Sequence, residues 1–107
     1  MVVSRFDIWL IGLDPTFGSE INKSRPCLVV SPDTSNQLLD NVIIAPMTTG
    51  MHPYETRITC AFGGKTGHII LDQLRTVDKQ RLITKLGVLE ETTAEVVLDR
   101  LAEMFAR

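Results

Sequence analysis

The strongest constraint on the fold of this chain is a series of short β-rich runs separated by turn residues. Each run has four to eight mainly apolar or β-branched residues, and clusters of Pro, Gly, Asn, Asp and Ser lie between successive runs. Short strands joined by turns form antiparallel sheets, and closing such a sheet removes its exposed edges. The pattern therefore predicts a small β-barrel. The expected strands are residues 7–13, 25–31, 42–47, 56–61, 68–71 and 82–89.

The second of these runs is the most apolar. Residues 27–30 read Cys-Leu-Val-Val, without polar alternation, which is typical of a strand buried on both faces. Pro26 has no N–H to donate and fits the first residues of a strand. Between the runs, residues 31–41 are expected to form a loop, residues 51–55 to turn the chain, and residues 75–79 to form a short turn or a single helical turn.

The last part of the chain has a different period. Apolar residues recur at helical spacing over residues 93–106, and Thr92 followed by Glu95 fits a capping box at the start. The expected fold class is therefore mainly β with α, a small barrel with one amphipathic C-terminal helix packed against it. The apolar residues of this helix are Ala94, Val97, Leu98, Leu101 and Phe105.

Length and composition limit the chain to one domain, residues 1–107. No apolar run approaches the roughly 18 residues of a membrane span, and no signal-peptide pattern is visible, so a cytoplasmic location without membrane contact is expected. The net charge of −2 argues mildly against a nucleic-acid partner. Residues 90–107 carry −3, however, which leaves +1 for the other 89 residues, so a local basic patch that binds RNA remains compatible with the composition.

The cysteines and histidines do not form a recognisable ligand set. Cys27 and Cys60 lie in separate expected strands and are predicted to be reduced, structural thiols. His52 and His68 are isolated from each other and from any Cys-x-x-Cys pair, so no zinc-like spacing is present. No metal site is therefore expected.

A polar segment, residues 18–26, lies between two apolar runs. It reads Gly-Ser-Glu-Ile-Asn-Lys-Ser-Arg-Pro, the composition of a loop that joins two strands. It brings a hydroxyl, a carboxylate, an amide, an ammonium and a guanidinium group together. By itself the segment is compatible with a solvated connection, but loops on a rigid scaffold commonly carry function.

Four segments, taken in order, resemble the MazF/PemK family of toxin endoribonucleases. They are residues 7–15 (DIW before LDP), 18–31 (GSE followed by SRPCLVVS), 45–49 (APMTT) and 67–82 (GHIILDQ followed by LRTVDKQRL). Each segment alone is a weak match, whereas four in this order and spacing cover nearly the whole chain. Phe6 departs from the pattern, since it replaces the glycine usually found before the family's first aspartate.

The resemblance implies an SH3-like barrel, a homodimer, and sequence-selective cleavage of single-stranded RNA without a metal or another cofactor. It implies attack by the RNA's own 2′-hydroxyl, which gives 2′,3′-cyclic phosphate and 5′-hydroxyl ends. It also implies a cognate antitoxin that wraps the dimer and blocks the RNA groove, with DNA contacted only indirectly through the toxin–antitoxin complex.

Two positions match the catalytic arginine and threonine of this family. Arg25 is expected to clamp phosphoryl oxygens with its planar fork, because a guanidinium loses its proton only above pH ~12 and so exchanges protons poorly. Thr48 is expected to donate its hydroxyl to a phosphoryl oxygen. Its alternative is a turn threonine that caps its own backbone.

Asp72 matches a position that is acidic in many relatives. It is either a general base or a structural carboxylate that accepts hydrogen bonds from the backbone or from an arginine. By period two it shares a strand face with His68 and Ile70. Ile70 stands where PemK-like members carry an arginine, so the acid–base pair of that branch does not carry over whole. This departure favours an arrangement built on Arg25 and Thr48, with the three strand ends at Arg25, Thr48 and Asp72 on one rim.

The remaining candidates are placed in an RNA groove, because hydroxyl, amide and guanidinium groups read phosphates and base edges. Glu20 is expected either to anchor its loop through backbone donors or to pair with Arg25. Phe17 is the aromatic residue expected to stack on a base. Three other aromatic residues are expected in the core: Trp9, Phe62 and Phe105. The expected RNA-binding residues are Phe17, Ser19, Glu20, Asn22, Lys23, Thr49, Gln73 and Arg75.

Two other functions stay open from the sequence. Toxins of the CcdB type share this barrel and poison DNA gyrase through an apolar C-terminal tip of the Trp-Gly-Ile kind, whereas residues 104–107 read Met-Phe-Ala-Arg. The other alternative is a barrel that has lost activity and only binds a partner helix. The presence of both Arg25 and Thr48 argues against it.

Overall fold

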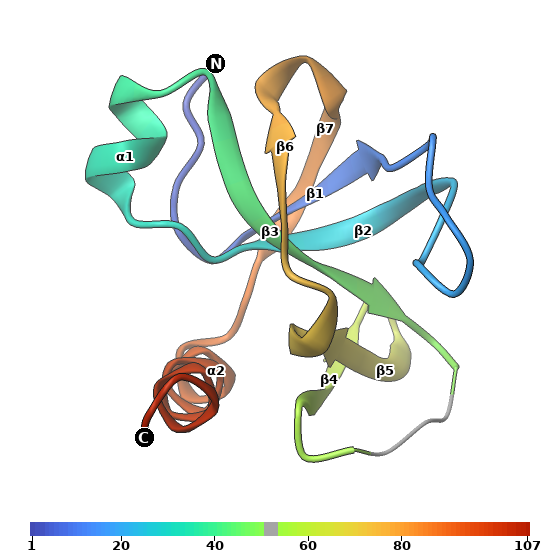
Figure 1. Ribbon diagram of the computed structural model, residues 1–107, viewed down its shortest axis with the longest axis vertical. Helices are drawn as coiled ribbons and strands as arrows, with labels where there is room; N and C mark the ends of the chain where they lie inside the picture. Colours follow the sequence, from blue (N-terminus) through green and yellow to red (C-terminus); the bar gives the residue numbers. More distant parts are fainter. Residues whose placement is uncertain (51–53) are drawn as a thin grey trace.

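The computed structural model describes residues 1–50 and 54–107, in which antiparallel strands form a curled sheet and a long helix ends the chain (Figure 1). The strands are β1 (Asp7–Gly12), β2 (Ser24–Val29), β3 (Asn41–Thr48), β4 (Arg57–Phe62), β5 (Lys65–Ile70), β6 (Arg75–Asp78) and β7 (Leu82–Val88). The helices are α1 (Asp33–Leu38) and α2 (Glu91–Met104), with 3₁₀ turns at Leu71–Gln73 and Lys79–Arg81.

The sheet has the strand order β4-β5-β3-β2-β1-β7, and β6 pairs with β3 beside this path. The long strand β3 changes its partner along its length: its first residues pair with β6 and its last residues, Met47 and Thr48, pair with β5. This change of partner curls the sheet into a half-barrel, and the expected fold class is confirmed. Within the described part of the chain, the sheet does not close into a complete barrel, because β4 and β7 stand at the two ends of the strand order and are not paired with each other.

The two ends of the half-barrel nevertheless meet through a side chain. A Cβ added to Gly87 on β7 would lie 3.2 Å from the ring of Phe62 on β4. Glycine at this position therefore lets the aromatic ring fill the gap that backbone hydrogen bonds leave open. Phe62 is half-buried there, as expected for a core aromatic.

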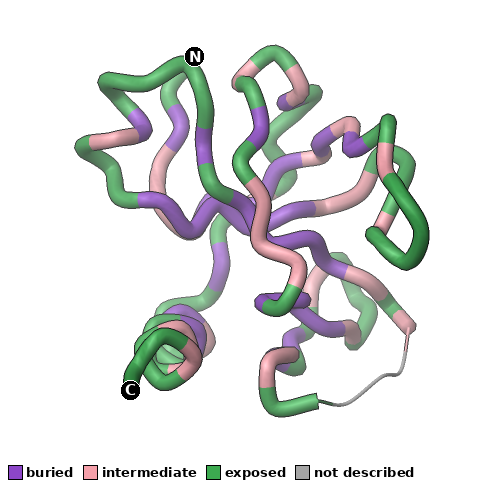
Figure 2. The backbone as a smooth tube through the Cα atoms, viewed as in Figure 1, coloured by how far each residue is buried: buried purple, intermediate pink, exposed green. Residues whose placement is uncertain are grey.

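Two hydrophobic clusters lie on the two faces of the sheet, and the central strands supply residues to both. Figure 2 shows the buried residues concentrated along these central strands. On β2, Leu28 belongs to the cluster beneath α2, whereas Cys27 and Val29 belong to the other cluster. Residues 27–29 are fully buried. The expected burial of this strand on both faces is confirmed, because successive side chains point to opposite faces.

The helix α2 packs on the first cluster through Ala94 and the fully buried Val97. The expected capping box is wrong: Glu90 precedes the helix, and the Thr92 hydroxyl donates to Glu90 Oε1. Phe105 is also not a core residue, because it follows the end of the helix and is 73% exposed. Arg100 ties the helix to the rest of the molecule by donating to the carbonyl of Glu55.

Three local expectations are corrected by contacts between distant segments. The expected loop at 31–41 contains α1, whose buried Asn36 exchanges hydrogen bonds with Ser31. The expected turn at 75–79 is mostly strand β6, since it pairs with the first half of β3. Asp72 lies in a 3₁₀ turn after β5 ends at Ile70, so the period-two face does not extend to it. Of the expected turn at 51–55, residues 51–53 lie outside the described residues.

Phe6 adopts a backbone conformation that favours glycine, with φ at 71°. Its N–H donates to Val29 and its carbonyl accepts from Leu89, so the conformation links the start of β1 to β2 and to the segment before α2. The ring packs against the first hydrophobic cluster. A side chain in this region costs about 1–2 kcal/mol, which the packing of the ring offsets. This conformation accounts for the glycine that the family resemblance led us to expect at this position.

Candidate nucleic-acid interface

A row of polar side chains crosses β2, β3 and β5. Thr48 on β3 lies directly opposite His68 on β5. Between β2 and β3, Cys27 lies opposite Pro46. Extending this pairing by two residues along each strand places Arg25 opposite Thr48. Directly opposed residues of antiparallel strands place their side chains on the same face. Arg25, Thr48 and His68 therefore form one polar row, and all three line a cavity of about 350 Å³, here named the row cavity.

The hydroxyl of Thr48 has one structural partner. It accepts a hydrogen bond from the N–H of Gly50 at 3.1 Å, which leaves its own proton available for donation. A Cβ on Gly67 would lie 2.3 Å from the Thr48 carbonyl oxygen, so only glycine permits this close approach of β5. Thr48 thus caps the following turn and can still donate to a ligand. Thr49 also lines the row cavity.

Arg25 is half-buried at the start of β2, and its Nε donates to the carbonyl of Asn22 at 3.0 Å. Within residues 1–50 and 54–107 it makes no ion pair with a carboxylate. The pairing of Glu20 with Arg25 is not seen, because Glu20 Oε1 accepts from the N–H of Phe17 at 2.5 Å and so anchors the loop. Arg25 can therefore bind an anion without first breaking a salt bridge.

The charges of two arginines act on the buried thiol of Cys27, which lies on β2. Burial raises the pKa of Cys27 to about 12, and the positive charges of Arg75 and Arg25 oppose that rise. Both cysteines are reduced, as expected. The effect of both charges on one thiol places the two guanidinium groups near the same region of the sheet.

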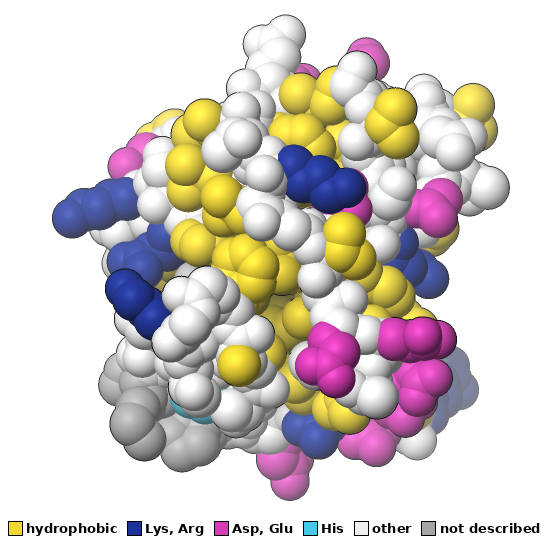
Figure 3. Space-filling model, turned by 180° about the vertical axis from the view of Figure 1, so that it is seen from behind, with side chains coloured by type: hydrophobic (Ala, Val, Ile, Leu, Met, Phe, Trp, Pro, Cys, Tyr) yellow, Lys and Arg dark blue, Asp and Glu magenta, His cyan; other side chains and the backbone are white. Residues whose placement is uncertain are grey.

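Charge is divided across the molecule. In Figure 3 the largest group of acidic side chains lies at the lower right, over α2, and a group of lysine and arginine side chains lies at the left, with further basic side chains elsewhere on this face. The expectation that acidity is concentrated in the C-terminal element is thus visible on the surface.

A second cavity of about 360 Å³, here named the loop cavity, lies where the β1–β2 loop meets the segment after β5. Two of the expected RNA-binding residues hold that loop. Gln73 Oε1 accepts from the N–H of Ile21 at 2.8 Å, and Arg75 Nη1 donates to the carbonyl of Leu13 at 2.9 Å. The residues that line the loop cavity are Ser19, Glu20, Ile21, Pro46, Asp72, Gln73, Leu74 and Arg75.

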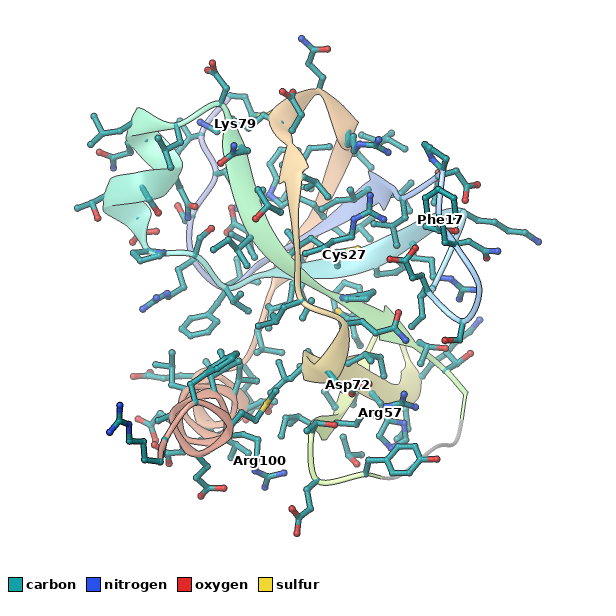
Figure 4. The ribbon with its side chains drawn as sticks, in the orientation of Figure 1. Phe17, Cys27, Arg57, Asp72, Lys79 and Arg100 are labelled. Carbon is teal, nitrogen blue, oxygen red and sulfur yellow. The ribbon has the colours of Figure 1, made fainter. Side chains whose placement is uncertain are left out.

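Asp72 is held by Thr56, which precedes β4, and by Arg57, the first residue of β4, whose side chain lies near it in Figure 4. Its carboxylate forms an ion pair with Arg57 at 3.2 Å and accepts from the Thr56 hydroxyl at 2.8 Å. Partial burial raises the pKa of Asp72, but the hydrogen bonds from Arg57 and Thr56 and the Arg57 charge outweigh it and lower the pKa below the ordinary value. The carboxylate is consequently a weak base that stays ionised.

The expected site residues thus fall into three groups. Arg25, Thr48 and Thr49 meet at the row cavity, whereas Asp72 lines the loop cavity instead of the same rim. Strand β3 contributes to both cavities, with Pro46 at one and Thr48 at the other. Ser19, Glu20, Gln73 and Arg75 also line the loop cavity. Three residues are exposed on the β1–β2 loop and line neither cavity: Phe17, Asn22 and Lys23.

Three residues of this region were not among the expected ones. His68 joins the polar row, and the signal for it was a polar residue within an otherwise apolar run. Arg57 holds Asp72 from 15 residues away, and Arg81 donates to the carbonyls of Gly12 and Asp14 at 3.2 and 2.6 Å. The roles of Arg57 and Arg81 depend on long-range contacts for which the sequence has no local signal.

The described residues contain no group of three or more His, Cys, Asp or Glu side chains that could hold a metal ion. Among the same residues, no helix is long and apolar enough to cross a membrane.

Comparison with known proteins identifies relatives along nearly the entire chain. A model of the PemK-like, MazF-like toxins of type II toxin–antitoxin systems matches residues 4–105. The chain is 33% identical over 103 residues to endoribonuclease EndoA of Bacillus subtilis, covering 91% of this chain and 89% of that protein. It is 35% identical over 106 residues to endoribonuclease PemK of Escherichia coli, covering 94% and 80%.

Solved structures share the fold. MazF from Deinococcus radiodurans superposes with a TM-score of 0.85 at 23% identity, covering 97% of this chain and 96% of that one. A mycobacterial endoribonuclease in complex with its cognate antitoxin has a TM-score of 0.80 at 22% identity, covering 94% and 92%. The match of the family model to residues 4–105 shows that this chain belongs to the PemK-like, MazF-like toxins of type II toxin–antitoxin systems.

Proposed function

We propose that this protein is a sequence-selective endoribonuclease toxin that cleaves single-stranded RNA, such as mRNA. Family membership and relatives named as endoribonucleases support this reaction class. The observation that carries the proposal is the polar row. It places a guanidinium without an ion-pair partner among the described residues next to a hydroxyl whose proton is available, at the wall of one cavity.

The reaction uses the 2′-hydroxyl of RNA as its nucleophile and uses no metal ion. As the 2′ oxygen attacks the adjacent phosphorus, negative charge grows on the phosphoryl oxygens. The fork of Arg25 binds two of these oxygens, and the Thr48 hydroxyl donates to one. The bond to the 5′ oxygen breaks, and the products are a 2′,3′-cyclic phosphate and a 5′-hydroxyl.

Asp72 acts in this proposal as a structural carboxylate and not as the base. Its ion pair with Arg57 and its hydrogen bond from Thr56 favour the ionised form and weaken it as a proton acceptor. It also lines a different cavity from Arg25 and Thr48. Asp72 therefore shapes the RNA path near the loop cavity.

The loop cavity and the β1–β2 loop supply the contacts for base selection. Phe17 is 82% exposed on that loop and offers a stacking surface for a base. Gln73 and Arg75 act mainly by holding the loop, since each already bonds to its backbone. Polar groups of the loop contact phosphates and base edges. These are Ser19, Glu20, Asn22 and Lys23, with Thr49 at the row cavity.

The proposed partners are a second copy of the chain and a cognate antitoxin protein. Solved structures of the same fold include complexes of related toxins with their antitoxins. The surface carries exposed apolar side chains that suit protein contacts, on β7 and on α2. They include Ile83, Leu86, Val88, Val96 and Leu98. The antitoxin blocks the RNA path on this proposal, and DNA is contacted only through the toxin–antitoxin complex.

The test is incubation of the purified protein with a long single-stranded RNA in EDTA, followed by mapping of the fragment ends. Discrete fragments with 5′-hydroxyl and 2′,3′-cyclic phosphate ends are expected. The variant Arg25→Ala, purified in the same way, controls for contaminating nucleases and is expected to leave the RNA intact.

Intact RNA with the wild-type protein would overturn the proposal. If gyrase–DNA complexes were trapped under the same conditions, the protein would instead act as a gyrase-poisoning toxin. If neither occurred and the protein only bound an antitoxin helix, it would be an inactive barrel. Mass measurement at micromolar concentration checks the dimer, and a clean monomer would contradict that part.

A further inference from the structure

His68 contributes an ionisable imidazole to the polar row. It lies on β5 directly between Thr48 on β3 and Thr59 on β4, and it is 8% exposed. It lines the row cavity together with Arg25 and Thr48. An imidazole thus lies next to Thr48 and lines the same cavity as Arg25, the two side chains that are proposed to hold the phosphate.

The hydrogen bond of the ring fixes which nitrogen carries the proton in the neutral form. His68 Nδ1 lies 3.0 Å from the carbonyl oxygen of Gly50. A carbonyl oxygen only accepts, so Nδ1 is the protonated nitrogen and Nε2 carries the lone pair. No second hydrogen bond of this ring is found among residues 1–50 and 54–107. Nε2 is therefore the basic atom.

The same glycine links His68 to Thr48. Gly50 donates its N–H to the Thr48 hydroxyl and accepts from His68 with its carbonyl. The two side chains are therefore held in one fixed relation by a single residue after β3. This arrangement resembles the general logic of an oriented base, in which one ring nitrogen is anchored so that the other faces the reacting group.

The groups around the row cavity leave His68 without a competing base. Arg25 on β2 and Lys65 on β5 line the cavity with it, and both are cationic. From β3 and β4 the titratable lining group is the thiol of Cys60, whose pKa burial raises. None of the described residues that line this cavity is Asp or Glu.

We propose that Nε2 of His68 is the general base that takes the proton from the RNA 2′-hydroxyl, a role that rests on the proposed function. The O2′–H bond breaks as the O2′–P bond forms, and the proton moves to Nε2, which makes the ring an imidazolium. The P–O5′ bond breaks, and the 5′ oxygen takes a proton from water. The imidazolium then returns its proton to solvent, so the cycle closes without another reactant.

The assay uses a short single-stranded RNA that contains one cleavage site mapped in the long RNA. The pH–rate profile of the wild type comes first, and kcat is expected to fall towards acidic pH, because a protonated imidazole has no lone pair with which to accept the 2′ proton. A profile without an acidic limb would overturn the role of His68 without any variant. Absence of cleavage by the wild type would overturn the proposed function instead.

The variant His68→Asn removes the basic nitrogen while keeping a donor for the hydrogen bond to the Gly50 carbonyl. The Asn amide can still donate to the Gly50 carbonyl from about the position of Nδ1, but it has no basic atom. We expect kcat to fall by about 10²–10⁴-fold, KM to stay within a few-fold, and the acidic limb of the profile to disappear. Thr59→Ala, opposite His68 on β4 and not among the residues that line the row cavity, is the matched control and should keep the wild-type rate and profile.

Added imidazole provides a readout that a structural role would not move. In His68→Ala, imidazole should restore cleavage by at least about 10-fold, with a rate that follows the fraction of unprotonated imidazole. If His68→Asn keeps the wild-type kcat and profile while the wild type cleaves, the proposal is overturned and the ribonuclease function stands. If the alanine variant does not fold, His68→Asn and the wild-type profile still decide.

Discussion

The row cavity and the loop cavity hold similar side chains in different states. At the row cavity, Arg25 donates to the carbonyl of Asn22 but has no described carboxylate partner, and the Thr48 hydroxyl keeps its proton. At the loop cavity, Asp72 is paired with Arg57, while Gln73 and Arg75 are bonded to the backbone of the β1–β2 loop. Residue type alone therefore does not separate chemistry from support, since both Arg25 and Arg75 bond to a backbone carbonyl. The difference between the two regions is the ion-paired carboxylate at the loop cavity and the available hydroxyl proton at the row cavity.

The largest effect should come from exchanging arginine for lysine in each region. Arg25→Lys keeps the charge but loses the fork, so kcat/KM for RNA cleavage should fall by about 10²-fold or more with an unchanged melting temperature. Arg75→Lys weakens the bond to Leu13 and should change cleavage by less than about 10-fold. Initial rates and thermal unfolding of both variants check this. Equal losses of cleavage would remove the distinction between the two cavities.

A smaller effect is expected at Arg81, which lines neither cavity and bonds to Gly12 and Asp14 at the base of the loop. Arg81→Met should lower the free energy of unfolding by about 1–2 kcal/mol, because two charge-assisted hydrogen bonds are lost. KM should rise several-fold, while kcat holds. Urea unfolding and steady-state kinetics measure the two quantities. A fall in kcat with an unchanged KM would mean that the loop takes part in the chemistry.

A still smaller effect is expected for Asp72→Asn. Its side chain is 35% exposed, so solvent screening limits the loss to less than about 1 kcal/mol at pH 7. The folded pKa is lowered, so the stabilisation is present above the unfolded value of about 3.9 and is lost as the pH falls through the folded pKa. The stability difference from the wild type should therefore shrink between pH 7 and pH 3, as followed by thermal unfolding.

The kinetics of Asp72→Asn test whether Asp72, instead of His68, is the general base. We expect its kcat to stay within about 10-fold of the wild type, because a carboxylate held by Arg57 is a weak base. A loss of the acidic limb of the pH–rate profile in this variant, with His68→Asn unaffected, would make Asp72 the base. The roles given to the two cavities would then be exchanged.

The smallest effect concerns Cys27, the fully buried thiol of β2. A thiol with a pKa of about 12 holds almost no thiolate at pH 8, so a thiol reagent should leave the native protein unmodified. Cys60, also buried with a raised pKa, should behave alike. Reaction in urea, where both thiols become accessible, is the control. Rapid modification of the native protein would show that the sheet beneath Arg25 is more open than the structure indicates.

Local sequence patterns correctly predicted those strands and helices whose buried faces follow from the spacing of their own apolar residues. The apolar run at 27–30 is a strand buried on both faces, and the helical spacing after residue 92 is α2. The same kind of reasoning missed β6, because residues 75–78 form a strand only through pairing with β3. It also missed α1, whose Asn36 is buried by a hydrogen-bond exchange with Ser31.

By itself the sequence determined the fold class, the family and two members of the polar row, Arg25 and Thr48. The fold class follows from the local spacing of apolar residues, and the family, Arg25 and Thr48 follow from residue identities. Both signals are contained in short stretches of the sequence. Only the tertiary structure decided that Arg57 holds Asp72 and that His68 stands beside Thr48 with its Nδ1 bound to Gly50. Those assignments depend on partners 15 to 20 residues away, and the curl of the sheet selects which distant polar atoms meet.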